Sequence, residues 1–332
     1  MNVRMILRRR ALLTYVTVGA ASASFSVDAK EVFRIAVLGS GREDTELSIN
    51  QMIWLRTGLR TVGLVEGKDF VFDAVWAGGD YERFPAMAAE VIARQPGAVI
   101  VSTIAAAEAA RSVSRTIPVV MTGLNDPVRA GLVANLARPG GNITGMATLN
   151  ENVVLKLLQF VTYLLPGAKK ITTLRNPSNP SSGPMLDAIK TSAVQLGFAV
   201  ANVDLTTPAT VDKAFEEVRR QGPDVLLIVP DNALAGLSKP IVSRALEQRL
   251  PVVGISRENA EAGGILSYGF SRQESVERVG VYIKKIMAGA NPADLPIEQP
   301  AKFELVVNRK TARALGIEIP IDVLATADEI VD

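Results

Sequence analysis

Residues 98–121 read AVIVSTIAAAEAARSVSRTIPVVM, and this stretch decides the fold class. It opens with the apolar run 98–101, continues with the alanine-rich run 104–114 and closes with the apolar run 118–121. Short runs rich in Val and Ile are typical of strands buried on both faces, whereas alanine favours helix. A strand, a helix and a second strand in this order predict a parallel crossover unit of an α/β sheet.

The same alternation extends to both sides of this stretch. Before it, strands are predicted at 33–38 and 70–76, and helices at 47–62 and 85–94. A second run of the pattern has predicted strands at 170–174, 198–203, 225–229 and 252–253, and helices at 185–196, 211–220 and 237–249. Two runs of one pattern predict two doubly wound parallel-sheet lobes of similar plan, although no direct sequence repeat relates them.

The glycine-rich segment 138–145, RPGGNITG, separates the two runs. It follows a predicted helix at 132–137 and leads into a predicted strand at 143–146. Glycine and proline mark turns because they supply or fix unusual backbone angles. We therefore expect the chain to leave the first lobe near this segment.

Two further extended segments, 264–268 and 303–307, enclose a predicted helix at 274–288. Three crossings between lobes would form a hinge, which lets the lobes close around a ligand as periplasmic binding proteins do. The predicted parts are an export signal at 1–29, lobe 1 at 31–146 plus about 269–302, and lobe 2 at 147–268 plus about 303–332.

The sequence contains neither cysteine nor histidine, and this limits the catalytic and metal-binding chemistry that the protein can perform. The 332 residues include no Cys, which excludes disulfides, thiolate nucleophiles and S-ligated metals. They include no His, the commonest general base near neutral pH and the commonest metal ligand. With 48% hydrophobic and 21% charged residues, the chain is able to bury two cores. The composition favours a binding protein over an enzyme, and we expect neither a metal nor a cofactor.

The N-terminus has the pattern of a secretory signal. Arg4, Arg8, Arg9 and Arg10 precede an uncharged stretch at 11–27, and small Ala29 marks a cleavage site. The run Arg9-Arg10-Ala11-Leu12-Leu13 also fits a twin-arginine signal apart from Ala11, so the export route stays open. A disordered basic tail after a misassigned start is the alternative. Export predicts a periplasmic protein, and the lack of Cys excludes a lipid anchor on a cysteine.

The charge of the mature chain does not favour nucleic acid as a partner. Cleavage after Ala29 removes four of 36 basic and one of 34 acidic residues, which leaves 32 and 33 and a formal charge of −1. Binding to phosphates calls for a concentrated basic face. We expect no nucleic-acid partner.

Eight segments, in order along nearly the whole mature chain, resemble one protein family. They include WAGGDYERFP at 76–85, LARPGGNITG at 136–145 and AGGILSYG at 262–269. The others lie at 58–67, 126–133, 292–300, 303–308 and 311–316. Together they resemble the substrate-binding proteins of ABC transporters, whose characterised relatives include tryptophan- and tyrosine-type binding proteins. The resemblance implies a type I periplasmic-binding fold, a small-molecule ligand in the cleft, an ABC permease in the inner membrane as partner, and no catalytic residues.

In open α/β sheets, ligands bind beyond the carboxyl ends of the strands, so strand ends supply the candidate residues of the first lobe. Ser40 follows the first strand, Ser102 and Thr103 follow the third, and Thr122 follows the fourth. Hydroxyls at a helix start either cap its N–H groups or leave them for a ligand carboxylate, and both readings stay open. The run Gly39-Ser40-Gly41 lacks the later glycines of a dinucleotide fingerprint.

The second lobe supplies Asn176, Asp231, Asn232 and Ser256 by the same argument. Asp231 would either pair with the ammonium of an amino-acid ligand or cap the helix that begins near Ala233. Asn176 and Asn232 are either turn residues or groups that donate and accept toward a polar ligand.

Three other functions remain as alternatives. A sensor of the same fold would report ligand occupancy to a membrane receptor. A LacI-type repressor core would require a helix-turn-helix, which the N-terminus lacks. An enzyme would require a nucleophile–base pair, a metal cluster or a phosphate loop, and no such motif is present. We expect a monomeric solute-binding component of an uptake transporter.

Overall fold

The structure, a computed structural model, describes residues 32–332. The predicted export signal at 1–29 lies outside the described residues. Within them the strands form two sheets, one of five strands and one of seven. The predicted α/β class with two mainly parallel sheets is confirmed.

The first sheet consists of β1 (Phe33–Gly39), β2 (Phe70–Trp76), β3 (Ala98–Val101), β4 (Val119–Asn125) and β5 (Ile143–Thr148). Its strand order is β2-β1-β3-β4-β5, and every neighbouring pair is parallel. All five strands therefore end at the same edge of the sheet, where the loops that follow them gather.

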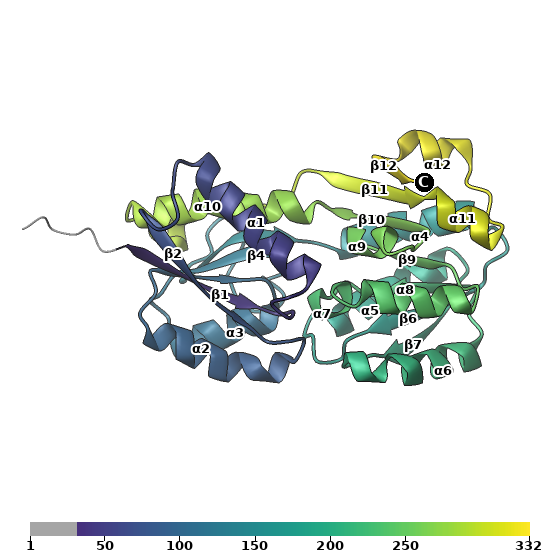
Figure 1. Ribbon diagram of the computed structural model, residues 1–332, viewed down its shortest axis with the longest axis horizontal. Helices are drawn as coiled ribbons and strands as arrows, with labels where there is room; N and C mark the ends of the chain where they lie inside the picture. The colour runs from purple at the N-terminus through teal and green to yellow at the C-terminus, as the bar shows by residue number, and fades with distance from the viewer. Residues whose placement is uncertain (1–31) are drawn as a thin grey trace, which may run out of the picture. The chain divides into compact units, whose positions relative to one another are not determined.

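Helices cover both faces of the first sheet (Figure 1). On one face lie α1 (Glu46–Thr61) and α10 (Arg272–Met287), and on the other lie α2 (Phe84–Ala93) and α3 (Ile104–Val113). Successive side chains of β1 point to opposite faces of the sheet. Ile35 packs in the core beneath α1 and α10, and Ala36 packs in the core beneath α2 and α3. Burial on both faces explains the continuous apolar runs of the sequence.

The second sheet has the strand order β12-β11-β10-β9-β8-β6-β7. Its strands are β6 (Lys170–Arg175), β7 (Ala199–Asp204), β8 (Val225–Ile228), β9 (Val252–Gly254), β10 (Leu266–Phe270), β11 (Phe303–Asn308) and β12 (Glu329–Val331). The pair β10–β11 is antiparallel and the other pairs are parallel.

Helices also cover both faces of the second sheet. One core includes residues of α4 (Glu151–Leu164) and α5 (Ser182–Gln195), and the other includes residues of α6 (Val211–Gln221) and α8 (Ser238–Glu247). The short elements are η1 (Tyr81–Arg83), η2 (Pro208–Thr210), α7 (Asn232–Ala235), α9 (Arg257–Glu261), η3 (Pro292–Asp294), α11 (Arg309–Leu315) and α12 (Ile321–Thr326).

The chain passes between the sheets three times: after β5, after β10 and before β11. Helix α10 follows β10 of the second sheet but packs against α1 and β4 of the first. We refer to the first sheet with α1, α2, α3 and α10 as lobe 1, and to the second sheet with its helices as lobe 2.

One predicted helix is wrong. Residues 132–137 form bends and irregular backbone in place of a helix. Asp126 and Gly131 have positive φ, and the amides of Leu132 and Val133 both bond the carbonyl of Pro127. Leu132 and Val133 are buried in the core of lobe 1. A six-residue stretch gains too little from helical hydrogen bonds to outweigh this burial.

Candidate functional site

A cavity of about 1000 Å³ lies between the strand ends of the two lobes. Its wall in lobe 1 comes from residues that follow β3 and from the last residues of β4 and β5. Its wall in lobe 2 comes from residues that follow β8 and β9, including α9. The carboxyl ends of parallel strands are where open α/β sheets bind ligands.

Six of the eight residues predicted from strand ends line this cavity: Ser102, Thr103, Thr122, Asp231, Asn232 and Ser256. Ser40 and Asn176 are buried and lie outside its wall. The strand-end argument therefore identified residues of both lobes that line one cavity. More than 100 positions in the sequence separate the residues of one lobe from those of the other.

The N-terminus of α3 opens into the cavity. The Thr103 hydroxyl accepts a hydrogen bond from the amide of Ala106 at 3.2 Å, so Thr103 caps the helix, which is one of its two predicted roles. The first turn of α3 carries no acidic residue. The Ser102 hydroxyl oxygen is buried and has no hydrogen-bond partner within the described residues. The first amides of α3 and the unpaired Ser102 hydroxyl together favour an anionic or electron-rich group of a ligand.

The ends of β4 and β5 form another part of the wall. The Thr122 hydroxyl donates to the carbonyl of Val101 at 3.3 Å, so it already has a partner. The register between the two strands shifts at Gly123, which has a φ of 121°. A Cβ at Gly123 would lie 3.5 Å from the Ser275 side chain and 3.8 Å from that of Thr148. Both distances are ordinary contacts, so the positive φ of Gly123, and not a lack of space, is what favours glycine here.

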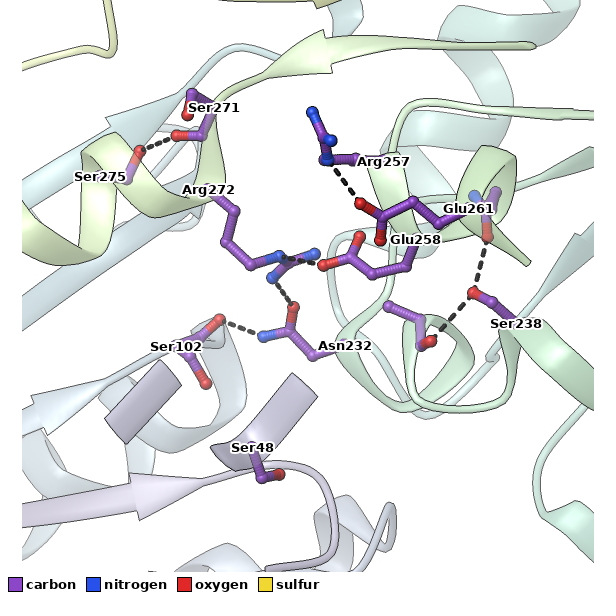
Figure 2. Close-up of polar contacts among 12 residues, drawn as sticks. Ser48, Ser102, Asn232, Ser238, Arg257, Glu258, Glu261, Ser271, Arg272 and Ser275 are labelled. Atoms are coloured by element: carbon purple, nitrogen blue, oxygen red, sulfur yellow. Dashed lines mark hydrogen bonds and ion pairs between the residues drawn. The ribbon is translucent and has the colours of Figure 1, made fainter. Parts of the chain in front are cut away.

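A polar network joins the lobes across the cavity (Figure 2). Arg272, the first residue of α10, donates from Nη1 to Asn232 Oδ1 at 2.6 Å and from Nε to Glu258 Oε1 at 3.0 Å. Asn232 donates in turn from Nδ2 to the carbonyl of Ser102 at 2.9 Å. The sequence predicted Asn232 and Ser102 but neither Arg272 nor Glu258.

Comparison with known proteins identifies the family. Residues 47–331 match the family described as ABC transporter substrate binding protein. The chain belongs to this family. Its members bind a solute for a transporter and are not enzymes, which confirms the function class predicted from the sequence.

Individual relatives support the same assignment. A tyrosine-binding protein of Clostridioides difficile (strain R20291) is 27% identical over 261 residues, 78% of this chain and 74% of the relative. A crystal structure of a conserved domain protein from Vibrio cholerae O1 biovar eltor str. N16961 is 28% identical, with a TM-score of 0.84 over 90% of this chain and 100% of that one. A structure of an ABC domain in complex with L-Trp from Streptococcus pneumonia shares the fold, with 24% identity and a TM-score of 0.82 over 90% of this chain and 100% of that one.

Asp231 has a structural position in this substrate-binding protein. It caps α7 by accepting from the amide of Leu234 at 2.8 Å, which confirms one of its two predicted roles. Its Oδ2 atom accepts from the Tyr81 hydroxyl of lobe 1 at 2.9 Å and from Asn179 at 2.8 Å. Asn176 donates to the same atom at 3.4 Å. Burial raises the pKa of Asp231, and these donors hold its charged form.

Residues 32–332 have three further properties. They contain no cluster of three or more acidic residues placed to hold a metal ion. None of their helices is long and apolar enough to cross a bilayer. The cations in the cavity wall are paired with carboxylates, such as Lys239 with Glu46 and Arg257 with Glu261.

Thr148, like Arg272 and Glu258, is a wall residue that sequence reasoning missed. Thr148 ends β5, is 7% exposed and has a hydroxyl without a partner within the described residues. The predicted strand stopped at 146, so the strand-end argument did not reach it. Arg272 follows the carboxyl end of β10, and applying the same argument to that hinge strand would have found it.

Proposed function

We propose that this protein is the periplasmic binding component of an ABC uptake system and that its ligand is an aromatic amino acid. The observation that carries the proposal is the cavity of about 1000 Å³, whose wall both lobes supply. Cavities of about 300–1000 Å³ suit small-molecule ligands. The ligand enters when the lobes separate and is enclosed when they close.

The composition of the wall supports the ligand class. Free amides at the start of α3 and the Ser102 hydroxyl suit a carboxylate. Trp54 and Phe270 contribute aromatic surface on which a flat ring packs favourably. The relatives named above include a tyrosine-binding protein and a structure in complex with L-Trp, which points to the same class.

The family and the N-terminus support the proposed partner and compartment. A substrate-binding protein of an ABC system delivers its ligand to a permease, which lies in the inner membrane. We assign export to the signal at 1–29 and infer a monomer that is free in the periplasm. Cell fractionation is expected to place a chain shortened by 29 residues in the periplasm. Full-length protein in the cytosol would contradict this assignment.

Binding itself is tested with mature protein, residues 30–332. L-Tyrosine or L-tryptophan at about a hundredfold excess over its dissociation constant is expected to raise the free energy of unfolding by about 2.7 kcal/mol. Chemical denaturation followed by tryptophan fluorescence measures this change, with D-glucose as the control solute.

Two results would count against the proposal. Stabilisation by glucose but by neither amino acid would exclude the aromatic amino-acid class and leave the transport role standing. Chemical turnover of a bound ligand would contradict the transport role as well.

A further inference from the structure

The lobes also meet away from the three segments by which the chain crosses between them. The turn at 78–81 of lobe 1 lies against the start of α7 in lobe 2, where the Tyr81 hydroxyl donates to Asp231 Oδ2 at 2.9 Å. Both side chains are buried. The crossings follow β5, follow β10 and precede β11, and neither residue belongs to them. This hydrogen bond therefore requires the lobes to lie together.

Each partner is held in place within its own lobe. The Tyr81 ring packs in the core of lobe 1, with its centroid 5.4 Å from that of Phe84. In lobe 2, Asp231 accepts at Oδ1 from the amide of Leu234 and at Oδ2 from the side chain of Asn179, each at 2.8 Å. Because both side chains are already ordered, little conformational entropy is lost when they meet.

Two neighbouring residues of α7 extend the contact. Ala233 packs against the core of lobe 1, and a Cβ at Gly79 would lie 3.6 Å from its side chain. Asn232 donates to the main-chain carbonyl of Ser102 at 2.9 Å. The three consecutive residues 231–233 thus each contact lobe 1. We refer to these residues and the turn at 78–81 together as the latch.

Ser40 and Asn176, the two predicted residues outside the cavity wall, support the latch. The Ser40 carbonyl accepts from the amide of Gly79 at 2.8 Å, and Asn176 donates to Asp231 Oδ2 at 3.4 Å. Tyr81 also lies outside the cavity wall. The Tyr81–Asp231 hydrogen bond thus joins protein atoms of the two lobes and needs no group of a ligand to complete it.

We infer that the latch holds the lobes together through contacts that do not involve the ligand, and that it thereby limits how fast a bound ligand leaves. The inference goes beyond the proposed function and rests on its capture of a ligand between two lobes. Separation of the lobes breaks the two hydrogen bonds of the latch and exposes Ala233 to water, whereas closure restores these contacts. The latch therefore favours the closed arrangement in addition to any contact that the ligand makes.

Tyr81→Phe keeps the ring in the core of lobe 1 and removes only the hydroxyl of the latch. Release of labelled L-tyrosine from this variant is expected to be about 10- to 100-fold faster than from wild-type mature protein, the range for a hydrogen bond to a charged group. Filter binding after dilution measures the release rate. Small-angle X-ray scattering of the ligand-free proteins is expected to give a larger radius of gyration for the variant, because its open arrangement is more populated.

Tyr282→Phe is the matched control. Tyr282 is 1% exposed, and its hydroxyl donates to the carbonyl of Pro296 at 2.9 Å. Both residues belong to lobe 1, since the segment 295–298 bonds to β5. This variant is expected to lose stability without a change in the release rate or in the radius of gyration. Retained binding of L-tyrosine shows that each variant is folded.

The results separate the latch from the proposed function. Faster release from Tyr81→Phe alone supports the latch. Release at the wild-type rate, or equal acceleration in Tyr282→Phe, overturns the latch and leaves ligand binding intact. A wild type that does not bind L-tyrosine counts against the aromatic class, and scattering then decides on the latch. In that case a larger radius of gyration in Tyr81→Phe alone supports the latch, and equal radii overturn it.

Discussion

At the scale of single residues, Asp231 and Tyr81 form a buried contact between the lobes. The Tyr81 hydroxyl donates to Asp231, and burial raises the pKa of Tyr81 so that it keeps its proton. Both side chains are nearly inaccessible to solvent, at 4% for Tyr81 and 6% for Asp231. Such a contact persists only while the lobes are together, because separation would expose both groups to water.

Tyr81→Phe removes one of the donors that hold the buried carboxylate. We expect the free energy of unfolding to fall by about 1–3 kcal/mol, because the charged acceptor loses a partner that water cannot replace. Urea denaturation of ligand-free protein measures the change. Tyr163→Phe is the control, since Tyr163 is 56% exposed on α4. An equal loss of unfolding free energy in both variants would show that the Tyr81–Asp231 hydrogen bond does not stabilise the fold.

The same pair predicts a pH dependence. Burial raises the pKa of the Asp231 carboxyl in the folded protein. The contribution of this carboxyl to the free energy of unfolding is therefore fully present at low pH and is lost as the pH rises through its pKa in the folded protein. The Tyr81 hydroxyl stabilises the charged form, so its removal raises this pKa further. We therefore expect the cost of Tyr81→Phe to be larger at pH 7 than near pH 4. Denaturation series of both proteins at the two pH values check the sign, and a cost that grows on acidification would contradict it.

Sequence reasoning placed residues correctly in the cavity wall where a clear strand end fixes their position. Thr103 and Ser102 follow a strand with an unambiguous apolar run, and both line the cavity. The partnership of Asn232 with Ser102 is not visible in the sequence, because 130 positions separate them. Ser40 and Asn176 also follow strands, but they lie outside the cavity wall, since strand ends alone do not tell which side chains reach the cavity.

At the scale of elements, the contact between α1 and α10 depends on two glycines. A Cβ at Gly58 would lie 2.0 Å from the carbonyl oxygen of Glu277, and a Cβ at Gly280 would lie 2.2 Å from that of Gly58. The two helix backbones therefore touch. This contact fixes α10, and with it Arg272, relative to the α1 residues that line the cavity.

Gly58→Ala is expected to lower the free energy of unfolding by about 1–3 kcal/mol, the usual cost of inserting a methyl group into a packed contact. Thermal denaturation of ligand-free protein measures it. Gly183→Ala is the matched control, because Gly183 lies in α5 with no atom within 4 Å of an added Cβ. Alanine there is expected to be neutral or stabilising by up to about 1 kcal/mol. Stability unchanged in Gly58→Ala would mean that the helices separate freely.

Strands and helices whose apolar residues follow a regular spacing were predicted with the most accurate boundaries. The predicted strand at 70–76 coincides with β2, and the predicted helix at 47–62 lies within one residue of α1 at each end. Helix α4 was missed although Val154, Leu157, Leu158 and Val161 follow helical spacing and are fully buried. The irregular backbone at 132–137 was not predictable, because positive φ at Asp126 redirects the chain before it.

At the scale of the whole molecule, two repeats of one strand–helix pattern were enough to predict two sheets. The contacts that hold the lobes together were not predictable, since each joins residues from separate runs, such as Tyr81 with Asp231. The exposed pair of Lys239 and Glu46 also joins the lobes, but both side chains are more than 70% exposed. Exposed pairs contribute little, so the buried Tyr81–Asp231 contact and the partly buried Asn232–Ser102 contact dominate.

A disulfide between the lobes tests whether ligand exchange requires them to separate. A Cβ at Gly79 of lobe 1 would lie 3.6 Å from the Cβ of Ala233 in lobe 2, within the range of about 3.5–4.5 Å for disulfides. The chain contains no cysteine to compete with an introduced pair. Gly79 has a φ of 88°, so a cysteine there costs about 1–2 kcal/mol, which a disulfide offsets.

In the double variant Gly79→Cys with Ala233→Cys, oxidation after loading with labelled L-tyrosine is expected to slow its release at least about tenfold, and reduction is expected to restore it. The reason is that the bond holds the two walls of the cavity at the separation seen in the structure, so the lobes cannot move apart to release the ligand. Filter binding after dilution measures the release rate, and each single cysteine variant controls for the strain at its own position. Equal release from the fully oxidised and the reduced protein would mean that the ligand leaves without separation of the lobes, and the capture mechanism proposed for this cavity would then be wrong.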